Sequence, residues 1–139
     1  MEFDKDFLGK LFEQAVTNPR LRQNFDLRTS PADTSQRMLN ALLPGTKVPI
    51  HRHEDTTETV ICLVGKLEEI IYEEVNEYIY EATSCCGDVT RQRKIREISR
   101  QILSPAEGKF GIQIPAGAWH TINVIEPSVI FEAKDGAYN

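Results

Sequence analysis

The stretch that decides the fold of this chain is residues 45–65, which read GTKVPIHRHEDTTETVICLVG. It holds two of the chain's three histidines, His51 and His53, spaced two residues apart in a segment of extended character. In a β-strand this spacing places both imidazoles on one face. Glu58 follows five residues later, and a short turn through residues 54–57 can bring its carboxylate back beside the two rings.

The remaining histidine, His120, follows a turn at residues 115–117 and begins another apolar segment. Imidazole and carboxylate together suit Zn, Fe, Mn, Ni or Cu, and four protein ligands leave an octahedral ion two open positions. We therefore predict one divalent metal ion bound by His51, His53, Glu58 and His120. The alternative is that His51 and His53 lie in an exposed loop, His120 forms a core hydrogen bond and Glu58 faces water.

Outward from this stretch, the chain is divided into short segments rich in β-branched and apolar residues, punctuated by Gly and Pro. They are residues 36–43, 59–64, 66–72, 110–114, 120–125 and 128–134. Many short strands with turn residues between them favour a sandwich or a closed barrel. Residues 4–17 instead repeat apolar side chains at three- and four-residue spacing before Asn18-Pro19, which predicts an amphipathic N-terminal helix.

The spacing of Gly45, His51, His53, Glu58 and Gly65 resembles the first cupin motif, and the order Pro115, Gly117, His120 resembles the second, whose asparagine comes early as Asn123. The chain is also similar to the WbuC family of cupin-fold metalloproteins over residues 51–53 and 58–59, over residues 114–121, and over residues 18–24, 36–41 and 131–138, which lie outside these motifs. The resemblance implies an all-β fold, the cupin double-stranded β-helix or jelly-roll barrel. It also implies a link to bacterial surface-polysaccharide (O-antigen) functions, without fixing a reaction.

We expect a single cupin domain over residues 1–139, with the N-terminal helix inside residues 1–19 and the barrel over residues 36–135. Residues 73–100 look like an insertion that forms a hairpin. Its basic side chains could bind an anion, but the acidic run just upstream favours a solvated hairpin with cross-strand charge pairs. The basic side chains are Arg91, Arg93, Lys94, Arg96 and Arg100.

Proteins that bind nucleic acid neutralise many phosphates with an excess of basic side chains. This chain has a net charge of −5, so we expect no nucleic-acid partner. No apolar run is long enough for a membrane span, and the acidic start does not resemble a secretory leader, so we expect a cytoplasmic protein. Cys62 and the vicinal pair Cys85-Cys86 have no zinc-site spacing, and we interpret them as reduced thiols.

Polar side chains in the segment leading into the barrel are candidates for binding a ligand beside the metal, or for tying the N-terminal arm to loop carbonyls. An arginine there would bind a carboxylate or phosphate through paired hydrogen bonds. The candidates are Arg37, Gln36, Asn40 and Arg22, with Arg20 and Asn24 close by in sequence. Strand alternation sends Trp119 to the face opposite His120, which predicts core or dimer packing for the indole.

Three functions fit these residues, and the sequence leaves open whether the chain is an enzyme. The first is a metal-dependent enzyme acting on a small polar or sugar-like substrate, and the second is a non-catalytic module that binds a carbohydrate or carboxylate. The third is an iron-dependent dioxygenase, and its only support is the metal-ligand set that cupins share. We also expect a homodimer, because a small barrel with exposed strand edges has apolar surface to cover.

Overall fold

The computed structural model describes residues 1–81 and 87–136, so the vicinal cysteines at 85 and 86 lie outside the described residues. Its helix, α1 (Lys5–Thr17), agrees with the expected amphipathic helix. The side chain of Asp4 caps it by accepting a hydrogen bond from the Phe7 N–H at 2.9 Å. Its apolar face packs on the outer side of β1 (Arg22–Asp26) and β2 (Ser35–Leu42), and the main contacts involve Phe7, Leu11, Phe12, Ala15, Phe25, Leu39 and Ala41.

The rest of the described chain is dominated by antiparallel strands: β3 (Glu58–Glu81), β4 (Asp88–Leu103), β5 (Gly111–Ile114) and β6 (Trp119–Asp135), with a 3₁₀ turn η1 (Pro105–Glu107). The strand order is β1-β2-β6-β3-β4, and β5 also pairs with β3. Both β3 and β6 are longer than the sequence pattern predicts. Each joins two of the expected strands, because the chain shifts register at the intervening Gly65 and Pro127 without leaving the ladder.

Gly65 makes this continuous, bent ladder possible. Its φ of +96° lies in the left-handed region, and a Cβ atom there would collide with the Pro127 carbonyl and with Ser128. The Ser128 hydroxyl closes the corner, since its Oγ accepts from the Lys66 N–H at 2.9 Å and donates to the Glu126 carbonyl at 2.7 Å. The β3–β6 pair therefore bends at one corner, and the six-stranded sheet folds there into two layers, which we call the first and the second sheet.

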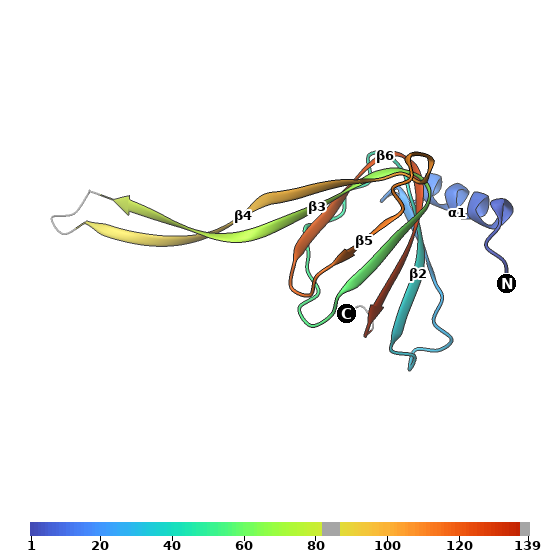
Figure 1. The fold of residues 1–139 in the computed structure, drawn as a ribbon, viewed down its shortest axis with the longest axis horizontal. Helices are drawn as coiled ribbons and strands as arrows, with labels where there is room; N and C mark the ends of the chain where they lie inside the picture. The colour runs from blue at the N-terminus through green and yellow to red at the C-terminus, as the bar shows by residue number, and fades with distance from the viewer. Residues whose placement is uncertain (82–86, 137–139) are drawn as a thin grey trace.

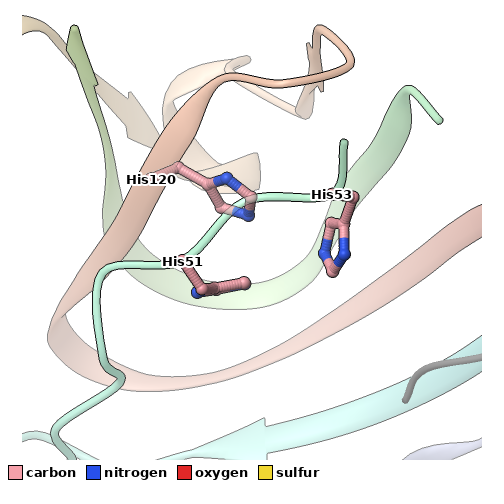
Figure 2. A group of neighbouring side chains, drawn as sticks. All are labelled: His51, His53 and His120. Atoms are coloured by element: carbon pink, nitrogen blue, oxygen red, sulfur yellow. The ribbon is translucent and has the colours of Figure 1, made fainter. Parts of the chain in front are cut away.

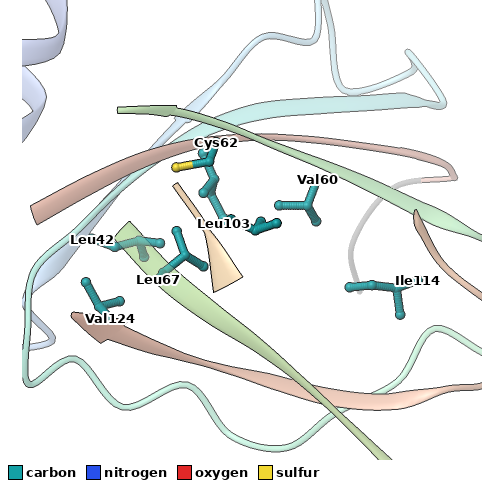
Figure 3. Packing of buried hydrophobic residues seen from close by; sticks show 8 residues of the cluster. Leu42, Val60, Cys62, Leu67, Leu103, Ile114 and Val124 are labelled. Carbon is teal, nitrogen blue, oxygen red and sulfur yellow. The ribbon is translucent and has the colours of Figure 1, made fainter. Parts of the chain in front are cut away.

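The first half of β3 pairs with β5 and with the second half of β6, which continues into β2 and β1. The second half of β3 pairs with β4 and with the first half of β6. Side chains from both sheets meet in one core, seen in Figure 3: Leu42, Val60, Cys62, Leu67, Leu103, Ile114, Val124 and Ile130. The arrangement is the expected jelly roll, but the described strands form an open path and do not close into a barrel.

On the inner face of the first sheet, cross-strand neighbours form rows, and these rows become more polar from one end of the strands to the other. Cross-strand partners share a face of the sheet. One row consists of Asn40, Ile130 and Cys62. The next row consists of Met38, Glu132 and Val60. The row after that is wholly polar: Gln36, Lys134 and Glu58. One end of the interior is thus an apolar core, and the other end is lined by polar groups.

Beyond Tyr72, β3 pairs only with β4, and Figure 1 shows this hairpin projecting far from the rest of the chain. Its basic strand is neutralised by its acidic neighbour, as the solvated-hairpin interpretation predicts. Arg96 pairs with Glu73 at 2.6 Å, and Lys94 pairs with Glu77. Arg100, at the base of the arm, pairs across the hairpin with Glu68 at 3.4 Å and along its own strand with Glu97 at 2.6 Å.

Candidate metal centre and its cavity

Three imidazoles converge at the polar end of the jelly roll. His51 forms a bridge to β6 by exchanging two backbone hydrogen bonds with His120, at 3.0 and 2.8 Å, and His53 lies two residues further along the same segment. One ring nitrogen from each of His51, His53 and His120 lies within 4.8 Å of the other two. Figure 2 shows the three rings arranged around a common space.

The tautomers of two rings are set by the backbone. The Nδ1 atom of His51 lies 2.8 Å from the Pro49 carbonyl, and that of His120 lies 2.9 Å from the Ala118 carbonyl. Because a carbonyl oxygen only accepts, Nδ1 carries the hydrogen in both rings and Nε2 presents its lone pair. The Nε2 atom of His120 is buried and has no hydrogen-bond partner among the described residues. A buried, unpartnered lone pair of this kind suits a metal ion.

Glu58 lies beside this cluster at the start of β3. Its side chain is almost fully buried, and its Oε2 atom is 2.8 Å from His53 Nε2. Burial lowers the pKa of His53 and of His120, which favours the neutral imidazole that a metal requires. The structure thus brings His51, His53 and His120 together as a group that could hold a metal ion, and it places the fourth predicted residue, Glu58, against His53.

A cavity of about 260 Å³ opens from the cluster into the interior of the jelly roll. It is lined by Arg20, Arg22, Asn24, Met38, Asn40, Val48, His51, Glu58, Glu69, His120, Ile122 and Glu132. A wider groove of about 800 Å³ reaches the cluster from outside, past His51, His53, Arg52, Trp119 and Lys134. The cluster therefore lies where an entrance groove meets an internal cavity of a size suited to a small ligand.

Two of the four predicted ligand-binding residues, Arg22 and Asn40, line the cavity. Arg37 does not, because adjacent strand residues face opposite sides and its guanidinium points outward, to Asp33 at 2.6 Å and the Ser35 carbonyl at 3.1 Å. Gln36 faces inward and is buried, but it lies in the row of Lys134 and Glu58, outside the cavity lining.

Arg22 combines both roles that the sequence left open for it. One of its terminal nitrogens donates to the Lys47 carbonyl at 2.8 Å, which ties the arm to a loop, while the side chain also lines the cavity. Burial lowers the pKa of Arg22, and the charge of Arg20 adds to this effect. Neither Arg20 nor Arg22 forms an ion pair with any residue in the described ranges, so the cavity has positive charge available for a ligand.

Trp119 does not pack in the core, which was one of the two roles predicted for it. Its indole Nε1 donates to Glu74 at 3.0 Å, and the Arg52 guanidinium stacks over its ring at 4.6 Å from the centroid. The ring therefore lines the entrance groove.

Glu69 and Glu132 are cavity residues that sequence reasoning missed. Neither residue is among the ligand-binding candidates chosen from the sequence. Burial, together with the charges of Glu132 and Glu58, raises the pKa of Glu69 well above its usual range. Burial and the charge of Glu58 raise the pKa of Glu132 to about 8. The alternation Leu67, Glu69, Ile71 in one apolar strand was the available indication that Glu69 faces inward.

The chain has the cupin fold, and structural comparison supports this. KdgF from Halomonas sp. superposes with a TM-score of 0.54 over 88% of this chain and 85% of its own, at 15% identity. An oxalate oxidase in complex with glycolate gives 0.56 over 86% of this chain, at 12% identity, and this chain spans about half (53%) of it. YcfD, a ribosomal oxygenase from Escherichia coli, gives 0.53 at 16% identity over 96% of this chain and 29% of its own.

At these identities the likeness shows the fold alone. The family is shown by the sequence: residues 3–83 match the model of a domain of unknown function, DUF6016, and the chain belongs to that family. No curated protein matches the sequence. Within residues 1–81 and 87–136, no helix has the length and apolar character needed to cross a membrane.

The raised pKa of Glu132 predicts a pH dependence of stability in metal-free protein. Between about pH 4.5 and pH 8 the folded state holds a proton that the unfolded state releases, so stability falls as the pH rises through this window. Glu132→Gln should flatten this decline and be more stable than wild type at pH 8. Urea unfolding in EDTA from pH 5 to 9 measures it, with exposed Glu126→Gln as the control. An unchanged slope in Glu132→Gln would contradict the assignment.

Proposed function

We propose that this protein is a metal-dependent cupin that binds one divalent ion, Zn, Fe, Mn or Ni, through His51, His53, Glu58 and His120. The observation that carries the proposal is the convergence of three imidazoles, two with Nε2 lone pairs directed by backbone hydrogen bonds, beside a buried carboxylate. Without a cation, so many polar groups would be costly to bury together.

The cavity beside the ion receives a small polar ligand. When bound, the ion supplies Lewis-acid chemistry or an activated water. The chain's own groups orient the ligand: Arg20 and Arg22 provide positive charge, and Asn40 provides an amide at the wall. Related folds hold small acids, since the oxalate oxidase structure contains glycolate and the YcfD structure contains cobalt and succinic acid. These findings support a carboxylate-bearing or sugar-like ligand for this chain.

Two carboxyls that line the cavity beside the ligand position, Glu69 and Glu132, favour an enzyme over a binding module, because they could also hold or release a proton during a reaction. An iron-dependent dioxygenase is a narrower alternative, and iron as the native metal would favour it. The resemblance to the WbuC family supports a place in bacterial surface-polysaccharide biosynthesis, in the cytoplasm. Metal analysis of protein purified without added metal would select among the candidate ions.

His53→Ala should abolish metal binding, because it removes one of four ligands and the partner of Glu58. We expect the affinity for Zn²⁺ to fall by more than about 100-fold, exceeding the loss typical of outer-shell changes. Calorimetric titration with Zn²⁺ and elemental analysis measure it. Arg52→Ala is the matched control, since Arg52 lies between the two histidines but is not a proposed ligand. Full metal content in His53→Ala would refute the ligand assignment.

Arg22→Ala should retain the metal but weaken binding of a small carboxylate, with glycolate as the probe. A charge-assisted hydrogen bond contributes roughly 1.5 to 3 kcal/mol, so the affinity should fall at least about tenfold. Arg37→Ala is the control, because it removes an outward ion pair with Asp33 that contributes at most about 1 kcal/mol to stability. Equal effects of the two substitutions on glycolate binding would remove Arg22 from the site.

We propose a homodimer formed through the outer side of β5 and the neighbouring part of β3. Among the described strands β5 pairs only with β3, so its other edge is open to the same edge of a second copy. Ile61, Leu63 and Phe110 beside it are 36%, 41% and 60% exposed. Sedimentation should show a dimer, and Phe110→Glu should yield the 15.8 kDa monomer. A monomeric wild type at micromolar concentration would overturn this proposal.

A further inference from the structure

The cavity contains two carboxyl groups that the metal centre does not use. Glu69 is only 2% exposed, and its Oε2 atom is buried without a hydrogen-bond partner among the described residues. Glu132 reaches the same cavity from β6. Burying a carboxyl without a cation or a hydrogen-bond partner is costly, so a group kept in this state needs a partner that arrives from outside the chain.

The two carboxyls approach the cavity from different sheets. Glu69 lies on the second half of β3, opposite Ile122, whereas Glu132 lies on the second half of β6, between Met38 and Val60. Asn40 is close to Glu132 along the first sheet, and its Oδ1 atom is likewise buried and unpartnered within the described chain. Three acceptor groups therefore line one space.

A second metal ion does not explain these acceptors. Within the described ranges, the cluster of His, Cys, Asp or Glu side chains with ligand atoms close enough to share an ion is His51, His53 and His120. A cationic amine fits poorly as well, because Arg20 and Arg22 line the same cavity. Hydroxyl groups remain, and they satisfy carboxyl and amide groups without bringing charge into the interior.

We propose that Glu69, Glu132 and Asn40 form a hydroxyl-binding subsite, and that the cavity accepts a small polyhydroxy acid whose carboxylate faces Arg20 and Arg22. The placement of the acid at a metal centre rests on the proposed function, whereas the subsite rests on the cavity alone. The raised pKa values of the two carboxyls agree with this assignment, since a neutral carboxyl both donates and accepts, as a hydroxyl does.

The test compares two probes that differ only in their hydroxyl groups. D-gluconate and hexanoate have the same carboxylate and chain length, and each is titrated calorimetrically into Zn²⁺-loaded full-length protein. We expect gluconate to bind wild type at least about tenfold more tightly than hexanoate, the difference expected for hydrogen bonds to buried polar groups. Because the 2-hydroxyl of gluconate can also chelate Zn²⁺, the same two probes are titrated into EDTA-treated, dialysed protein, where the preference should persist. This pair of comparisons needs no variant, so it remains decisive if a substitution impairs folding.

Glu69→Met keeps the length of the side chain and removes its polar atoms, so it should bring the gluconate-to-hexanoate ratio close to one. Glu69→Gln, which can still bind hydroxyls, should retain part of the preference, and Glu126→Met on exposed β6 should leave it unchanged. Equal affinities in wild type, no gluconate binding, or an unchanged ratio in folded Glu69→Met would overturn the subsite.

Elemental analysis of the same samples separates this inference from the proposed function. A preference for gluconate in protein that binds no metal would support the subsite and overturn the metal centre. Bound metal at the His51 cluster with no preference between the probes would overturn the subsite alone.

Discussion

The pairing of β3 with β6 around the Gly65 corner is the constraint on which the other parts of the structure depend. One antiparallel ladder runs through both sheets because its register shifts at the corner without breaking. A side chain at position 65 would collide with the Pro127 carbonyl and Ser128, so the corner requires glycine. The bend sets the first half of each strand against its own second half, and the core of Figure 3 fills the space between them.

The same ladder determines which side chains meet at the polar end. Glu58 and His120 belong to β3 and β6, and the bridge between His51 and His120 brings the preceding loop to the sheet with His53. The site therefore consists of groups held by backbone hydrogen bonds on both sides, and little movement is needed to gather them. Such preorganisation is what a metal centre requires of its protein.

The interior is also divided by polarity, and this division has an energetic cost. The apolar end contributes hydrophobic stabilisation, whereas the other end holds Glu69, which is buried, and Glu132, which is half-buried, both with raised pKa values. Functional sites commonly retain groups that oppose stability in the free protein, because binding a partner offsets their burial. The long charged hairpin is a different case, since its acidic and basic strands neutralise each other in solvent.

The sequence by itself determined features that depend on local pattern: the helix before Asn18, the three histidines as metal-ligand candidates, and the charge-paired strands of the arm. His51 and His53 do not lie on a regular strand, because their segment is a loop that meets β6 through a single bridge at His51. Only the tertiary structure decided which face of each strand, and therefore which side chains, line the cavity. Arg22 and Asn40 line it and Arg37 does not, while Glu69 and Glu132 line it from strands whose sequence does not reveal which face is inward. The physical reason is that side chains along a strand alternate between its two faces. Which set faces inward is decided by the register with strands that are distant in sequence, and this register shifts at Gly65.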